Sequence, residues 1–381
     1  MNQNSSRHTT PKRALMHRLH NISLHNRFPL SGELIRWEKI NQLFLLLALT
    51  VAFFGIWNVG QQIQIIYASN PAINESNDSS NLAFHIYDWI VNLGIYDLGG
   101  VTPFAIGLLY FIPLVLVSLL ACEFWDWFFV KFFNRIKDGG NLSICFIFAL
   151  LLPINIPLSY VILGISFGIV FGKFIFGGTG RYLVSPVLLG VLFLSYSYPS
   201  LFNDSFTNIL STDAYLSMPM QEHIWSRLLT GGQSGFVSIA TVSGFWSLLC
   251  LTALLVLRKE YVGVVIGALL GLWFATLLLN SPDKSAVWQI QWYWHLVTGS
   301  FAFCLVFIAT DLTVLPITPL GRIIYGCIFG FLTLVIRIAN KNHPEGTMMA
   351  LLLTSLLVPI VDWFIVMSHQ TILQYKRRRA L

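Results

Sequence analysis

The sequence has few charged residues: Asp, Glu, Lys and Arg together make up 10% of its 381 residues. A soluble globular domain carries roughly 25%, so this scarcity excludes a water-soluble enzyme. Hydrophobic residues make up 55% of the chain, and the mean hydropathy is +0.69. Several apolar runs approach the roughly 20 residues that a helix needs to cross a bilayer. The composition therefore predicts an all-α polytopic membrane protein.

Cysteine is also scarce, and its spacing excludes two classes of site. No two of the five cysteines form a Cys-x-x-Cys pair, so the sequence offers neither a metal site nor a disulfide framework. Each lies in or beside an apolar segment, at Cys122, Cys145, Cys250, Cys304 and Cys327. We therefore predict buried packing thiols, and the sequence singles out no catalytic residue.

Apolar runs between polar breaks predict about ten membrane-spanning helices. They cover residues 41–60, 102–121, 142–156, 158–176, 184–197, 236–257, 261–279, 292–310, 320–339 and 347–368. The aromatic stretch 124–135 contains Lys131 and Arg135, which is typical of an interfacial helix and not of an eleventh span.

The net charge of +6 arises from basic residues near the two ends and in short loops, which indicates membrane orientation and no nucleic-acid partner. With the N-terminus in the cytoplasm, 19 of the 23 Lys and Arg residues fall on the cytoplasmic side of ten helices. The exceptions are Arg227, Lys284, Arg337 and Lys341. The positive-inside rule therefore predicts a multi-pass protein with both termini cytoplasmic and the loop 61–100 outside.

The chain also repeats itself at an offset of five helices. Two prolines are each followed by two glycines at identical spacing: Pro157, Gly164, Gly168 and Pro319, Gly326, Gly330. A second proline precedes each set, at Pro153 and Pro316. Because the offset is odd, the two copies must lie in opposite orientations, as in transporters with proline-broken half-helices. Close helix packing explains the glycines equally well, but not the matched prolines.

This repeat predicts the domain organisation. A basic cytoplasmic tail, 1–40, precedes the first five-helix repeat at 41–200. An outer loop at 201–235 leads to the second five-helix repeat at 236–368, and a basic cytoplasmic tail follows at 369–381. The first forty residues contain no short apolar core, so we expect no cleavable signal peptide.

Four acidic residues lie within the predicted spans or at their ends: Glu123, Asp126, Asp311 and Asp362. Ionisable groups in a membrane are costly and often functional. No Lys or Arg is expected at comparable depth, so the carboxylates suit a sodium ion or a proton. Alternatively, Glu123 and Asp126 face water at the interface, and Asp362 is a hydrogen-bonded structural acid. For Asp311, beside a proline break, we favour a functional role.

Two further segments could contact a cofactor. Backbone amides of the glycine-rich turn Gly177-Gly178-Thr179-Gly180-Arg181 can hold a phosphate or a polar ring edge, although tight loops between short helices need glycine anyway. The cluster Trp292-Tyr293-Trp294-His295 is typical of an aromatic belt at the membrane interface. The more specific alternative is that the cluster forms a stacking surface for a flat cofactor or a quinone, in which Trp292 and His295 contact the ligand.

Ordered motifs along most of the chain resemble the NqrB/RnfD family, the membrane subunits of the sodium-pumping NADH:quinone reductase and of the related Rnf complex. They are Phe53-Phe-Gly-Ile-Trp-Asn-Val-Gly60, Gly164 to Arg181 with Pro186, Trp292-Tyr-Trp-His-Leu296, Ala309-Thr-Asp311, Arg322-Ile-Ile-Tyr-Gly326, Pro344-Glu-Gly346, and Pro359 with Asp362. The Asn-Val-Gly and Trp-Tyr-Trp-His strings are more similar to NqrB than to RnfD.

The resemblance implies a protein of the bacterial inner membrane that passes electrons through flavin and couples this to sodium movement. It implies a covalent FMN on the threonine of a Ser-Gly-Ala-Thr motif, a non-covalent riboflavin, and partners that include the other complex subunits, lipid and a quinone. Asp311 and Asp126 match family acids that are linked to sodium movement.

The chain departs from the family at its flavin and quinone motifs. It contains no Ser-Gly-Ala-Thr, and Ser217 is the one hydroxyl near the equivalent place. Tyr182 and Ser185 replace two asparagines, Phe174 replaces an acid, and Cys122-Glu123 replaces a glycine pair. We therefore expect that covalent FMN is lost and that any flavin is a non-covalent riboflavin or FMN.

Two functions follow from these observations. The first is a membrane subunit of an NADH:quinone reductase-like translocase, which couples electron transfer to sodium movement. The alternative is a flavin-free transporter or channel on the same scaffold.

Overall fold

The computed structural model describes residues 29–69, 101–133, 140–153, 156–178, 182–206, 238–279, 292–297, 299–339 and 346–380. Within these ranges the chain is helical and contains no β-strand; the β-type pairing there is a single bridge between Pro153 and Ser238. Both the all-α class and the membrane character that the composition predicted are confirmed.

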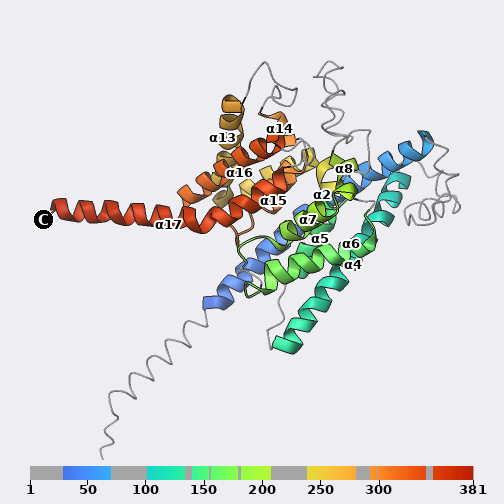
Figure 1. Ribbon diagram of the computed structural model, residues 1–381, viewed down its shortest axis with the longest axis horizontal. Coiled ribbons are helices and arrows are strands. Elements are labelled where there is room, and N and C mark those ends of the chain that lie inside the picture. The colour runs from blue at the N-terminus through green and yellow to red at the C-terminus, as the bar shows by residue number, and fades with distance from the viewer. Residues whose placement is uncertain are drawn as a thin grey trace, which may run out of the picture.

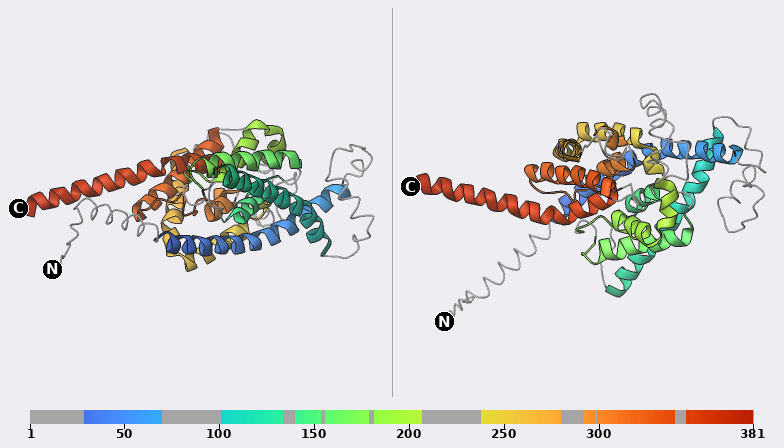
Figure 2. Two further views of the ribbon diagram at one scale, coloured as in Figure 1. Left: turned by 90° about the horizontal axis from the view of Figure 1, so that it is seen from below. Right: turned by 45° about the horizontal axis from the view of Figure 1, so that its top comes forward.

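Five helices of the described chain are long and apolar enough to cross a membrane. They are α2 (Pro29–Ser69), α4 (Val101–Phe133), α13 (Val262–Leu279), α16 (Pro319–Ala339) and α17 (Thr347–Ala380). Figure 1 shows α2 and α4 side by side, and Figure 1 and Figure 2 both show α17 extending from the helical body to the C-terminus. The count of ten spans stays a prediction.

Shorter helices occupy the other predicted spans. Four are apolar segments: α5 (Asn141–Leu151), α6 (Leu158–Phe167) with its π-helical continuation η3 (Gly168–Phe174), α7 (Pro186–Ser197) and α12 (Gly244–Leu257). Of the remaining short helices, α11 (Ile239–Val242), α14 (Trp294–Val297) and α15 (Phe301–Phe307) lie within predicted spans, whereas α8 (Pro199–Phe206) and η4 (Lys259–Tyr261) lie mainly outside them.

The structure corrects two predicted elements. Residues 124–133 are no separate interfacial helix, because α4 runs unbroken to Phe133, and no Gly or Pro follows Pro113 within it. The predicted span 292–310 is broken, because Gly299 adopts a φ of 69° between α14 and α15. Glycine adopts this left-handed conformation without steric cost.

Both proline pairs interrupt the helices, as predicted. Helix α5 ends at Leu151, and α6 begins after Pro157. Helix α15 ends at Phe307, and α16 begins at Pro319. Proline lacks the amide hydrogen that an internal helical position donates, and it disfavours the helical conformation of the preceding residue. The superposition of the two halves as inverted repeats stays a prediction.

Glycines bring α13 and α16 into direct backbone contact. A Cβ atom at Gly267 or Gly271 would collide with carbonyl groups of α16, and one at Gly326 or Gly330 would collide with those of α13. Small residues permit such close approach between membrane helices. The packing interpretation of these glycines is therefore confirmed.

Candidate functional site

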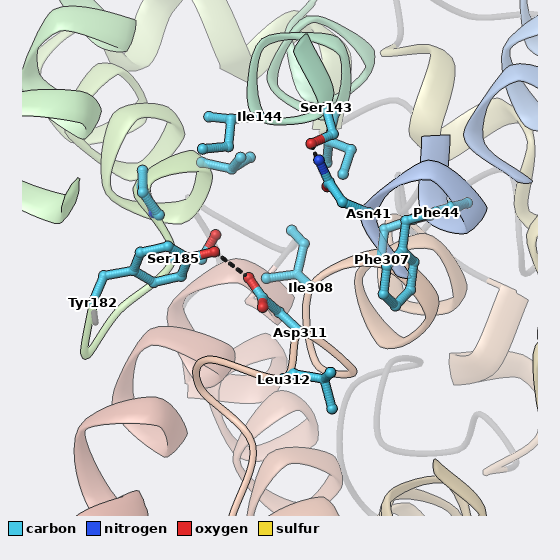
Figure 3. A pocket seen from close by; sticks show the side chains of 13 residues that line it. Asn41, Phe44, Ser143, Ile144, Tyr182, Ser185, Phe307, Ile308, Asp311 and Leu312 are labelled. Atoms are coloured by element: carbon cyan, nitrogen blue, oxygen red, sulfur yellow. Dashed lines mark hydrogen bonds between the residues drawn. The ribbon is translucent and has the colours of Figure 1, made fainter. Parts of the chain in front are cut away.

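Asp311 lies in the non-helical segment between α15 and α16, at the edge of a small cavity (Figure 3). The cavity has a volume of about 40 Å³ and is lined by four segments of the chain. Its polar lining residues are Asn41 of α2, Ser143 of α5, Tyr182, Ser185 and Asp311. A water molecule needs roughly 10–15 Å³ of such space, so the cavity has room for a small ion or a few waters.

Three donors hold the Asp311 carboxylate. The Tyr182 hydroxyl donates to Oδ2 at 2.8 Å, as drawn in Figure 3. The backbone amide and hydroxyl of Thr313 donate to Oδ1 at 3.0 and 2.9 Å. Within the described part of the chain, no Lys or Arg forms a salt bridge with this carboxylate. Neutral hydrogen-bond donors therefore stabilise the carboxylate charge, and the carboxylate can still bind a small cation.

Oxygen atoms dominate the polar lining of this cavity. Besides the carboxylate and the Tyr182 hydroxyl, it contains Ser185 and the pair Ser143–Asn41, in which Ser143 Oγ donates to Asn41 Oδ1 at 2.5 Å. Hard monovalent and divalent cations prefer carboxylate, carbonyl and hydroxyl oxygens. The sequence indicated Asp311 but missed the role of Tyr182, because its contact with Asp311 spans 129 residues.

Asp126 forms a buried ion pair, which overturns the expectation that no basic residue lies at comparable depth. Lys173 of η3 is fully buried, and its Nζ lies 3.3 Å from Asp126 Oδ1. Nζ also donates to Asn141 Oδ1 at 2.7 Å, and Asn141 Nδ2 donates to Asp126 Oδ2. Charge counting assigned Lys173, near the end of the predicted span 158–176, to the cytoplasmic side, because an apolar run does not reveal that η3 turns this side chain toward α4.

Glu123 belongs to the edge of the same cluster. It is exposed, and Asn141 Nδ2 donates to its Oε1 at 3.0 Å. Glu123 is thus exposed at the protein surface, whereas Asp126 is 2% exposed and does not face water as the alternative supposed.

Asp362 of α17 has the hydrogen bonds of a structural acid. Its carboxylate accepts from the Ile317 amide at 3.1 Å and from the Thr318 hydroxyl at 3.2 Å. These contacts secure the segment between Pro316 and Pro319 against α17. A part in ion movement stays a prediction for this residue.

The glycine-rich turn ends η3. Gly177 and Gly178 adopt φ angles of 112° and 103°. Their amides donate to the carbonyls of Phe174, at 3.2 Å, and Lys173, at 2.9 Å. These two amides therefore complete the helix end, and a contact of the turn with a cofactor stays a prediction. The predicted contacts of Thr179, Gly180 and Arg181 lie outside the described residues, as does Ser217.

His295 takes part in a buried contact with Arg337. Arg337 Nη1 donates to the His295 carbonyl at 3.0 Å and lies 3.3 Å from its Nδ1, and Nη2 donates to Thr347 at 3.1 Å. This arginine is 5% exposed, so it joins α14, α16 and α17 in the interior. Its burial explains one exception to the charge asymmetry. The neighbouring Trp292 packs edge-on against Tyr293.

The fold and these sites define a helical membrane protein with carboxylates held between its helices. The chain belongs to the NQR2, RnfD, RnfE family, whose sequence model matches residues 29–370. The predicted family resemblance is thereby confirmed.

Three curated relatives are each named as a subunit of a Na(+)-translocating NADH-quinone reductase. The protein of Ectopseudomonas mendocina (strain ymp) is 33% identical over 347 residues, which cover 86% of this chain and 82% of the relative. That of Pseudomonas aeruginosa (strain LESB58) is 31% identical over 349 residues, with the same coverage. That of Chromohalobacter salexigens is 32% identical over 334 residues, which cover 83% of this chain and 79% of the relative.

Proposed function

We propose that this chain is the membrane subunit of a sodium-translocating NADH:quinone reductase-like complex and that sodium passes through the Asp311 cavity. The observation that carries the proposal is a carboxylate at a helix break, bound by neutral donors, in a cavity whose polar lining residues offer further oxygen atoms. The family membership and the names of the relatives support the same function.

Asp126 and Glu123 form a second acidic site on the proposed ion pathway. They differ from Asp311 because the Lys173 ammonium already neutralises Asp126. An ion at Asp126 would have to compete with this tethered cation, whereas an ion at Asp311 would not. We therefore assign the principal ion site to Asp311 and secondary positions on the pathway to Asp126, Glu123 and Asp362.

The described residues offer no fit for a flavin at the Asp311 cavity. A space of about 40 Å³ is far smaller than a three-ring system needs, and the amides of Gly177 and Gly178 are already bonded. We therefore derive no electron-transfer step through these residues. A quinone belongs to the proposal through the relatives' name, and a non-covalent riboflavin or FMN belongs to it through the family resemblance.

Purification under mild detergent separates the two functions that the sequence left open. If the chain is a redox subunit, a tagged copy from its native membrane brings other redox subunits and a flavin absorbance spectrum with it. A colourless chain that purifies alone, and that carries solute without an electron donor, would establish the flavin-free transporter instead.

We expect no covalent FMN on this chain. A phosphoester needs a hydroxyl in the outer loop, and the family's threonine motif is absent, with Ser217 the nearest hydroxyl. The denatured protein on a gel under ultraviolet light should show no flavin fluorescence. A fluorescent band that disappears in Ser217→Ala would refute this expectation.

The loop 61–100 should lie outside, with both termini in the cytoplasm, because it contains no Lys or Arg. A cysteine introduced by Ser79→Cys should react with an impermeant thiol reagent added to intact cells. A cysteine introduced in the basic C-terminal tail by Ala380→Cys is the matched control and should react after lysis. The reverse pattern would overturn the topology.

A further inference from the structure

Helices α4 and α5 meet along one buried face of each. On α4, Ser118, Cys122 and Asp126 follow each other at intervals of four residues, and all three are at most 2% exposed. Residues four apart lie on the same side of a helix. On α5, Asn141 and Cys145 have the same spacing and are also buried.

The contacts between these faces define an antiparallel register. Asn141 Nδ2 donates to Asp126. One turn further, Cys145 Sγ lies 2.7 Å from Cys122 Sγ and 3.4 Å from the Ser118 carbonyl. Residue numbers therefore increase along α5, while those of the contacting residues on α4 decrease. The hydrogen bond between Asn141 and Asp126 therefore fixes how closely the two thiols approach each other one helical turn away.

The two sulfur atoms are close enough to react with one another. A disulfide bond is about 2.05 Å long, so a separation of 2.7 Å requires a movement below one ångström. Both residues are free thiols here. The other well-buried thiols have hydroxyl neighbours instead: Cys250 lies 3.2 Å from Thr50 Oγ1, and Cys304 lies 3.6 Å from Ser300 Oγ.

We propose that Cys122 and Cys145 are a reversible dithiol–disulfide pair that joins α4 to α5. Oxidation forms the Sγ–Sγ bond and breaks both S–H bonds. The two protons and two electrons pass to a two-electron acceptor of the quinone or azo class, which becomes a quinol or a hydrazine. A dithiol reductant reverses the step. The disulfide fixes the two helices one turn from the Asp126–Asn141 contact.

This proposal rests on the helix pair and not on the proposed function. Its consequence for Asp126 is local: an oxidised pair limits the separation of α4 and α5 beside the Lys173–Asp126 ion pair. Sequence reasoning did not find the pair, because the two cysteines are 23 residues apart and lie in different helices.

Diamide, a membrane-permeant azo compound, tests the proposal on the full-length protein in its native membrane. After treatment, the protein is denatured in acid, alkylated with N-ethylmaleimide, reduced, and labelled with a maleimide of high mass. We expect two of the five cysteines to take up the second label and peptide mass analysis to find Cys122 linked to Cys145. Complete alkylation in the first step, or a linkage between other cysteines, would overturn the proposal.

Matched variants sharpen this result. Cys122→Ser and Cys145→Ser should each abolish the second labelling, whereas Cys250→Ser should retain it. Should a variant fail to accumulate, the peptide map of the wild-type protein still decides between the outcomes. Labelling that persists in Cys122→Ser would contradict the pairing.

Discussion

Lys173→Met is expected to lower the free energy of unfolding by roughly 3–5 kcal/mol, because it leaves the buried Asp126 carboxylate without its counter-ion. Methionine fills much of the same volume and removes the charge. The Asn141 side chain also loses a donor at 2.7 Å. Thermal unfolding of the purified protein in detergent measures the effect.

Two further variants separate the ion pair from general damage. Lys131→Met is the matched control, since Lys131 is exposed and contacts the face of Trp127 at 4.9 Å; its loss should cost about 0.5–1 kcal/mol. The double variant Lys173→Met with Asp126→Asn removes both charges and should recover part of the lost stability. A single Lys173 variant as stable as the Lys131 control would show that the ion pair contributes little.

Asp311→Asn should weaken sodium binding by about 10- to 100-fold, because interactions with a charged group contribute roughly 1.5–3 kcal/mol. The amide keeps the size and shape of the side chain. Its one oxygen can still accept from Thr313 at the Oδ1 position, while its NH2 group takes the place of Oδ2 opposite the Tyr182 hydroxyl. The loss therefore reports on charge more than on packing. The sodium concentration that half-saturates turnover measures it.

Tyr182→Phe is the matched control for Asp311. It removes one hydrogen bond of 2.8 Å and leaves the carboxylate charge in place. This bond positions the carboxylate but carries none of its charge, so the change in sodium affinity should be only several-fold, smaller than that of Asp311→Asn. If Asp311→Asn is stable, assembled and unchanged in its sodium dependence, then Asp311 is a structural residue.

The sequence predicted the general architecture well, because bilayer thickness constrains apolar runs so strongly. It also placed the interruptions at Pro153–Pro157 and Pro316–Pro319, since proline acts locally. It predicted a continuous helix through 292–310 wrongly, because a left-handed glycine inside an apolar run has no distinct pattern.

The electrostatic partners were harder to predict. Lys173 lies near the end of the predicted span 158–176, just before the glycine-rich turn, so its position in the sequence favoured the cytoplasmic side of the membrane. Its burial depends on η3 packing beside α4, and its contact with Asp126 spans 47 residues. The contacts Tyr182–Asp311 and Arg337–His295 are equally remote in sequence. Periodicity assigns a residue to a face of its own helix, but it does not identify the side chain opposite.

Sodium uptake into inverted membrane vesicles tests the central claim most directly. Vesicles from cells that contain the chain should accumulate radioactive sodium when NADH is added. Vesicles from cells that lack it should not, and a plasmid copy should restore uptake, whereas a copy with Asp311→Asn should restore little. NADH-driven sodium uptake that is equal with and without the chain would contradict the proposed function.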